Sequence, residues 1–315
     1  MKNAKKKKKQ SLRRGRPDFK WSYLFTLNPL NVFKNCAKVL KENGYEVTAS
    51  TTEGDFIYAP GDIPVLLVAH VDTVHDKLPK VYQDKDRGVL WSYTGLGADD
   101  RAGVAAILDI VSSGLRPHVL FCNYEESGGR GAKLASLELN PEVSFVIEFD
   151  RQGSEDSVFY RCDNMDFENY INELGFKTAF GSFSDISILC PEWGVAGVNL
   201  SIGYYHAHTE SEILVLKQWE ETVTKAKVLL SREEFPVFEY DTFVYEEHHS
   251  YDYSFIPDIN AQLLADMMGG NARMWAKWLV RHEDDLRIHM QDALEDIIYD
   301  YASRYIPDEL WEDAI

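Results

Sequence analysis

Four stretches of the chain rich in apolar residues predict strands, and one of them is a nearly unbroken apolar run typical of a strand buried on both faces of a sheet. The clearest is IPVLLVAHV at residues 63–71, which is rich in β-branched and aliphatic side chains. The other three predicted strands lie at 117–126, 143–150 and 194–205. Each is followed by polar residues, so the chain turns where each run ends.

Helical patterns separate these strands along the sequence. The predicted helices fall within 21–47, where Gly44 is the stop signal, and at 101–114, 130–139, 167–174, 184–192 and 217–235. Strands that alternate with helices in this way are typical of α/β folds with a mostly parallel sheet. We therefore predict a three-layer α/β/α sandwich around a mostly parallel central sheet.

The pattern changes at both ends of the chain. Residues 1–17 carry six Lys and three Arg and no acidic residue, so we expect a disordered basic tail over 1–19. Residues 241–315 carry 17 acidic and five basic residues and several apolar residues at helical spacing. We predict a small acidic helical appendage over 241–315 and one large domain over 20–240.

Composition limits where such a chain could work. It has 315 residues, a formal net charge of −18 and four cysteines without a C-x-x-C pair. No apolar run approaches the roughly 20 residues of a membrane helix, and the start lacks the apolar core of a signal peptide. Reduced thiols in a cytoplasmic protein are the expected reading. The sequence leaves the oligomeric state open.

The basic tail admits two interpretations. Its positive charge could contact nucleic acid or another anionic partner. A solvated tail without a dedicated partner explains it equally well, because the tail has no aromatic residues on which bases could stack.

Acidic residues and histidines gather next to the ends of the predicted strands. They are His70 and Asp72, Asp99 and Asp100, Glu125 and Glu126, Asp150, and His206 and His208. Each alone is an ordinary cap, turn or solvated residue, but the carboxyl ends of parallel strands collect ligands at one edge of a sheet. Converging carboxylates repel one another, and divalent cations would resolve that repulsion. The mixed imidazole and carboxylate set suits zinc, with cobalt or manganese as substitutes.

The order of these motifs resembles that of the co-catalytic di-zinc peptidases. H-x-D at 70–72 is followed by GADDRAG at 97–103, EESGGRGA at 125–132, a strand that ends in Asp150, and YYHAHTESE at 204–212. The resemblance is to the M20, M28 and M42 groups, which include tripeptidase T, the aminopeptidases and the aminoacylase-type enzymes. It covers roughly residues 60–230 and implies the three-layer fold of these zinc exopeptidases.

The resemblance implies a role for each ligand. His70 and Asp150 would bind one zinc, and Asp72 would stand behind His70 to fix its tautomer and basicity. Asp99 would bridge both zinc ions. Glu126 would bind the second zinc together with one histidine of the last motif.

The resemblance leaves two choices open near the end of the site. His208, which has Glu212 four residues later, is favoured as the last ligand over His206, which has Glu210 at the same offset. Asp185 in GSFSDISIL also resembles a family position near the site, but its role is open.

Two zinc ions imply a definite chemistry. At a separation of about 3.5–4 Å they would hold a bridging water and lower its pKa. Glu125 would be the general base that takes the proton and passes it to the leaving amine. The resemblance thus implies an exopeptidase, most of all an aminopeptidase on short peptides.

The chain departs from the family in the spacing of its motifs. M20 enzymes place a lid or dimerisation domain before the last ligand, yet only 58 positions separate Asp150 from His208 (208 − 150). M42 enzymes insert their extra domain between the first histidine and the bridging aspartate, and that gap is 29 positions (99 − 70). We expect a di-zinc peptidase-like domain without a lid, arranged as in the M28 group.

Two other functions compete with the aminopeptidase. A deacylase or carboxypeptidase would cleave a similar amide, such as that of an N-acyl amino acid, with the same metals. A catalytically inactive binding or scaffold protein could keep the fold, and the oppositely charged ends favour such a role. Peptides with free and blocked amino ends would separate the first two, and Glu125→Ala would separate turnover from scaffolding.

Overall fold

The computed structural model describes residues 17–52 and 54–241. Residues 1–16 of the predicted basic tail and nearly all of the predicted helical appendage lie outside the described residues. Within the described part, Phe19 packs against the large domain, with its ring centroid 4.8 Å from that of Trp219.

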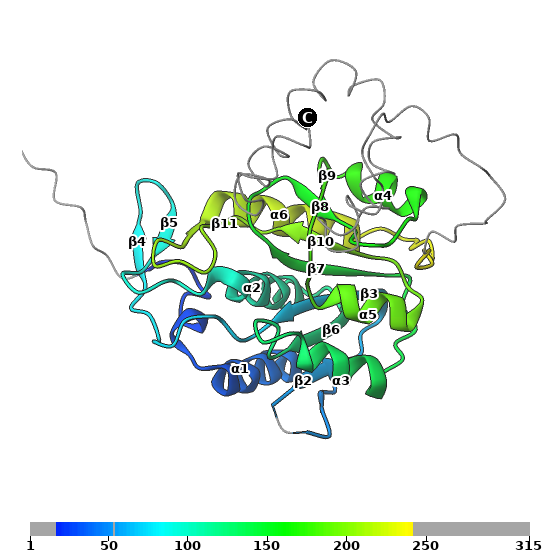
Figure 1. Cartoon of the computed structure of the whole chain (residues 1–315), viewed down its shortest axis with the longest axis horizontal. Helices are drawn as coiled ribbons and strands as arrows, with labels where there is room; N and C mark the ends of the chain where they lie inside the picture. The colour runs from blue at the N-terminus through cyan, green and yellow to red at the C-terminus, as the bar shows by residue number, and fades with distance from the viewer. Residues whose placement is uncertain (1–16, 53, 242–315) are drawn as a thin grey trace, which may run out of the picture. The chain divides into compact units, whose positions relative to one another are not determined.

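An eight-stranded sheet forms the centre of the domain, with the strand order β1-β2-β6-β3-β7-β10-β8-β9 (Figure 1). The strands are β1 (Thr48–Ala49), β2 (Phe56–Ala59), β3 (Ile63–His70), β6 (Pro117–Cys122), β7 (Phe145–Arg151), β8 (Asp156–Val158), β9 (Lys177–Ala179) and β10 (Gly197–Ser201). The neighbours β6, β3, β7 and β10 are mutually parallel, so their carboxyl ends share one edge. The predicted α/β fold with a mostly parallel sheet is confirmed.

Helices cover both faces of this sheet. They are α1 (Pro29–Glu42), α2 (Ala98–Ser112), α3 (Arg130–Glu138), α4 (Met165–Asn172), α5 (Ile186–Trp193) and α6 (Leu216–Leu230), after a short 3₁₀ turn at Leu24–Thr26. In β3, Val65, Leu67 and Ala69 pack into the apolar cluster that contains α1, α2 and α6. Leu66 and Val68 pack into the opposite cluster with α3 and α5. Strand β3 is buried on both faces because successive side chains alternate between these layers.

The first helix has clear start and stop signals. The Asn28 side chain accepts a hydrogen bond from the Asn31 backbone N–H at 2.9 Å, and Pro29 occupies the first helical position; both are ordinary N-terminal signals. The helix ends at Glu42, and Gly44 follows with a φ of 80°. These signals fix where α1 starts beside the site described below.

A second, four-stranded sheet has the order β11-β12-β5-β4. Its strands are β4 (Tyr82–Asp84), β5 (Val89–Trp91), β11 (Tyr204–Tyr205) and β12 (Ile213–Val215). The predicted single strand at 194–205 is therefore wrong, because it is split into β10 and β11 at Gly203. Gly203 has a φ of 89°, and a Cβ there would lie 2.9 Å from the Trp219 backbone nitrogen.

The predicted strand at 117–126 is also too long. Strand β6 ends at Cys122, and Tyr124 has a φ of 65° that no strand adopts. Glu125 and Glu126 thus lie in a loop after the strand, where the chain is free to turn them towards neighbouring strand ends.

The cysteines agree with the expectation of reduced thiols. All four are free, and Cys36, Cys122 and Cys190 are buried. Among the described residues, the helices are too short or too polar to pass through a bilayer.

Candidate metal centre

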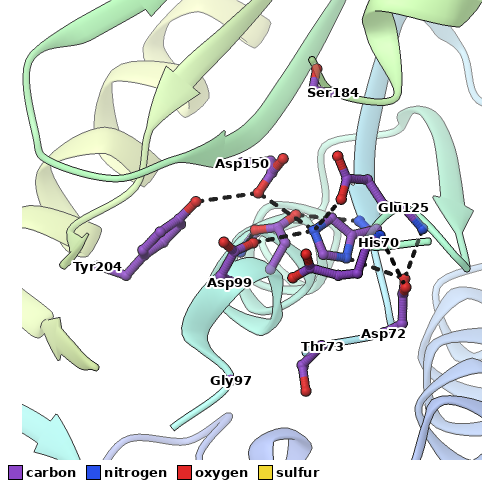
Figure 2. A network of polar contacts seen from close by, with 12 residues as sticks. His70, Asp72, Thr73, Gly97, Asp99, Glu125, Asp150, Ser184 and Tyr204 are labelled. Atoms are coloured by element: carbon purple, nitrogen blue, oxygen red, sulfur yellow. Dashed lines mark hydrogen bonds and ion pairs between the residues drawn. The ribbon is translucent and has the colours of Figure 1, made fainter. Parts of the chain in front are cut away.

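Acidic side chains and imidazoles meet at the carboxyl edge of the central sheet (Figure 2). His70 is the last residue of β3, and Asp150 lies near the end of β7. Asp99 lies at the start of α2, and Glu125 and Glu126 follow β6. The parallel strands bring these residues together because their ends lie side by side.

His70 lies fully buried at the centre of this group. Its Nε2 atom lies 3.2 Å from Asp99 Oδ1, 3.5 Å from Asp150 Oδ1 and 3.9 Å from Glu125 Oε2. Its Nδ1 atom lies 3.3 Å from Asp72 Oδ1 on the other side of the ring. One ring nitrogen thus faces the potential metal ligands, and the other faces a single carboxylate.

Asp72 is fixed in place by the loop that carries the two glutamates. Its Oδ1 and Oδ2 atoms accept hydrogen bonds from the backbone N–H groups of Glu125 and Glu126, each at 3.2 Å. Burial alone would raise the pKa of Asp72, but the hydrogen bond with His70, the charge of His70 and the backbone bond from Glu125 lower it. Asp72 is therefore held as an anion behind the His70 ring.

Asp99 has a second set of neighbours on the side away from His70. His208 Nε2 lies 3.2 Å from Asp99 Oδ2 and 3.2 Å from Glu126 Oε2. Burial would raise the pKa of Asp99, but hydrogen bonds with His208 and His70 lower it overall. Asp99 therefore presents one oxygen to each imidazole.

Three groups of ligand atoms are close enough to surround an ion, with all atoms of a group within 4.8 Å of one another. They are His70, Asp99 and Asp150; Asp99, Glu126 and His208; and His70, Glu125 and Glu126. The first two share Asp99, and each offers one imidazole and two carboxylates. Three protein ligands with one position left for water or substrate are the usual donor set of catalytic zinc.

Two acids of this cluster, Glu126 and Asp150, are unusually hard to ionise. Burial, followed by the charge of Asp99, raises the pKa of Glu126 to about 7. The same two causes hold the pKa of Asp150 well above its usual range. The Oε1 atom of Glu126 is buried without a hydrogen-bond partner among the described residues. Crowded, unpartnered carboxylates are the arrangement that a cation stabilises, so the donor set fits a pair of divalent ions.

The two candidate histidines occupy different positions. Both side chains are exposed, but His208 contacts Asp99 and Glu126, whereas His206 makes no polar contact with the cluster in the described part of the chain. Glu212, which follows His208 at the predicted spacing, is buried, and the exposed Glu210 is not. The geometry therefore favours the pair His208 and Glu212.

Glu212 supports the loop that leads into Asp99. Its carboxylate accepts hydrogen bonds from the backbone N–H groups of Gly97 at 2.5 Å and Asp99 at 3.0 Å. His75 Nε2 lies 3.1 Å from the same carboxylate. The sequence contains the H-T-E-S-E motif but does not reveal that this glutamate positions Asp99.

Asp185 lies beside the cluster but belongs to none of the three ligand groups. It is fully buried at the start of α5, and burial raises its pKa to about 7, with the charges of Glu125 and Asp72 adding to the effect and that of His70 opposing it. Asp185 therefore lies next to the candidate ligands and outside their three groups.

Three further residues near the site were not predicted. The Tyr204 hydroxyl donates to Asp150 Oδ1 at 3.3 Å, and Asn199 pairs with the Asp150 backbone at 2.8 and 3.0 Å. Glu148, two positions before Asp150 on β7, is fully buried and accepts a hydrogen bond from Ser184. An acid within the apolar run FVIEFD was a visible signal, but Tyr204 and Asn199 gave none.

No family model matches this sequence, and none of the curated proteins is similar to it. Solved structures are similar in fold. Aminopeptidase PepT from Bacillus cereus is 15% identical with a TM-score of 0.55, and the match covers 67% of this chain and 96% of that one. A tripeptidase from Staphylococcus aureus is 16% identical with a TM-score of 0.55, covering 67% and 97%.

A TET aminopeptidase from a marine-sediment archaeon, Thaumarchaeota archaeon SCGC AB-539-E09, is 13% identical with a TM-score of 0.53, covering 68% of this chain and 96% of that one. At these identities the likeness establishes the fold. The fold implied by the resemblance to the di-zinc peptidases is therefore confirmed.

Proposed function

We propose that this chain is a zinc-dependent exopeptidase, specifically an aminopeptidase on short peptides. The observation that carries the proposal is Asp99, whose two oxygens each lie 3.2 Å from a different histidine, His70 and His208. His70 and Asp150 would hold one ion and Glu126 and His208 the other. When bound, the ions would supply Lewis acidity that polarises the scissile carbonyl and acidifies water.

Glu125 is the proposed general base. Its side chain lies beside the ligands, with Oε2 3.9 Å from His70 Nε2. Burial raises the pKa of Glu125, with the charges of Asp99 and Asp72 adding to it and that of His70 opposing it. A carboxylate with a raised pKa is a better proton acceptor near neutral pH. Glu125 would take a proton from the attacking water and donate it to the departing amine.

Asp72 and Tyr204 act through neighbouring residues. Asp72 holds the His70 ring so that Nε2 faces the ligand cluster, and it also fixes the backbone of Glu125. The Tyr204 hydroxyl holds Asp150 Oδ1 at 3.3 Å. Both residues keep the ligands in one geometry, which catalysis by positioned groups requires.

The choice of an aminopeptidase over a deacylase or carboxypeptidase has two supports. The solved structures of similar fold include an aminopeptidase PepT, a tripeptidase and a TET aminopeptidase. The residues that line the hollow beside Glu126 include no Lys or Arg that could bind a substrate carboxylate.

We also propose that the enzyme is cytoplasmic, which its four free cysteines support.

Hydrolysis of matched tripeptides tests this function. Leu-Gly-Gly and its N-acetyl form would be incubated with the full chain after zinc loading, with EDTA-treated protein as a control. Release of leucine from the free peptide alone is the expected result. Cleavage of the acetylated peptide would favour the deacylase, and release of the C-terminal glycine would favour the carboxypeptidase. If neither peptide is cleaved with zinc, cobalt or manganese, the non-catalytic binding or scaffold protein is favoured.

A further inference from the structure

A hollow of about 730 Å³ opens between the start of α1, the loop after β3 and the loop after β6. We propose that this hollow receives the side chain of the substrate's amino-terminal residue and selects uncharged, mainly apolar side chains. The proposal rests on the aminopeptidase function and defines its substrate class.

The hollow adjoins the metal centre directly. Asp72 and Glu126 belong to both, and Glu126 Oε2 lies 3.2 Å from His208 Nε2. A substrate whose terminal peptide bond lies at the ligand cluster therefore brings its first side chain to the mouth of the hollow. Pockets of this size accommodate ligands much larger than one side chain, so leucine or phenylalanine fits with room for backbone.

Apolar side chains form one wall of the hollow. Phe33 is almost fully buried behind it, while Leu30 on the first turn of α1 is 46% exposed and Val74 is 42% exposed. Leu30 and Val74 thus present apolar surface to solvent along the same hollow. A bound apolar side chain would remove this surface from water, and such burial favours binding.

The charges of the lining disfavour both kinds of charged side chain. Among the lining residues only Asp72 and Glu126 are charged. Asp72 is engaged by the backbone of Glu125 and Glu126, and Glu126 faces His208. An acidic substrate side chain would meet two carboxylates and no Lys or Arg among the lining residues, and a basic one would find both carboxylates already engaged. Burying an unpaired charge is costly, so neutral side chains bind best.

Arg130 lies against Tyr124, one of the lining residues, and its side chain is engaged by Tyr124 and Asp55. Its guanidinium lies over the Tyr124 ring at 3.8 Å from the centroid, and its Nε donates to Asp55 at 2.5 Å. The Tyr124 carbonyl also accepts a hydrogen bond from the Gly129 N–H at 2.8 Å. Arg130 therefore fixes Tyr124, a lining residue, as a preformed wall, and preformed walls improve discrimination.

The first test compares fluorogenic aminoacyl amides with a free amino group, carrying leucine, phenylalanine, lysine or glutamate. We expect kcat/KM for leucine and phenylalanine to exceed that for lysine and glutamate by at least about 10-fold, the scale of pocket discrimination. Equal kcat/KM values for all four amides, or a preference for a charged residue, would overturn the proposed role of the hollow and leave the proposed function standing. Cleavage of no member would overturn the proposed function and the pocket with it.

A matched pair of variants locates the selectivity. Leu30→Arg should shift the glutamate-to-leucine ratio of kcat/KM by about 10-fold or more, mainly through KM. Leu137→Arg on α3, where Leu137 is 80% exposed and does not line the hollow, should leave the ratio unchanged. Calorimetric binding of free L-leucine and L-glutamate to the full chain gives a readout independent of turnover. An unchanged preference in Leu30→Arg by both methods would overturn the assignment.

Discussion

Oδ2 of Asp99 lies 3.2 Å from Nε2 of His208. This contact joins the start of α2 to the loop between β11 and β12, two segments far apart in the sequence. The other oxygen of Asp99 faces His70 at 3.2 Å. A carboxylate with one oxygen directed at each of two imidazoles can bridge two cations, so the proposed paired site depends on Asp99.

Replacing the two histidines of the last motif should have unequal effects. His206 and His208 have φ values of 59° and 64°, and asparagine tolerates this backbone region. The two substitutions His206→Asn and His208→Asn should therefore change the conformational free energy of the backbone by similar amounts. His208→Asn should lower zinc affinity by more than about 100-fold, because losing a ligand weakens binding more than changing a residue that only orients a ligand. His206→Asn should change it little. Competition with a chromophoric chelator measures both, and equal affinities would refute the assignment.

Glu125→Gln should separate catalysis from metal binding. We expect kcat to fall by about 10²- to 10⁴-fold, the usual contribution of a general base, while zinc content stays at the wild-type level. The exposed Glu210 provides a control, since Glu210→Gln should leave both unchanged. Loss of zinc in Glu125→Gln would instead make Glu125 a ligand, as its grouping with His70 and Glu126 permits.

Asp72→Asn should weaken metal binding without removing a ligand. The two oxygens of Asp72 accept two backbone N–H groups, and asparagine offers only one acceptor oxygen. We expect zinc affinity to fall by about 10- to 100-fold. The exposed neighbour gives the control Asp76→Asn. Identical affinities in the two variants would mean that Asp72 does not orient His70.

The metal-free protein should become less stable as pH rises. Burial raises the pKa values of Glu126 and Asp185 to about 7, and the hydrogen bond with Asp99 raises that of His208 to about 9. Between the ordinary and the raised values, the folded state holds protons that the unfolded state has lost. Stability is therefore greatest below this window and falls as pH rises through it.

Calorimetry of EDTA-treated protein checks this dependence. The melting temperature should be higher at about pH 5.5 than at about pH 8.5, and zinc should reduce or reverse the difference because bound cations replace the protons. A metal-free melting temperature that rises over the same interval would contradict the described environment of these groups.

Four strands of the central sheet, β3, β6, β7 and β10, could be predicted from the sequence because their signals are local, whereas the short strands β1, β2, β8 and β9 were not predicted. Residues 63–70 form a β-branched and aliphatic run typical of a strand buried on both faces, and the run ends in His70. The small second sheet left no such signal, since β4, β5 and β12 have three residues each and β11 two. Strands that short show no recognisable alternation.

The choice between His206 and His208 needed the structure. Both histidines have a glutamate four positions later, so spacing treats them alike. They differ because Glu212 is buried against the backbone of Gly97 and Asp99, which holds that end of the loop to the cluster. The contact of Tyr204 with Asp150 likewise depends on the packing of the two sheets, which no local pattern records.

Zinc titration into the metal-free full chain, followed by calorimetry, tests the central claim most directly. Wild-type protein should bind two zinc ions per chain, and Asp99→Ala should lose tight binding at both positions because Asp99 belongs to both ligand groups. Binding of two ions with unchanged affinity by Asp99→Ala, or of none by the wild type, would contradict the paired site.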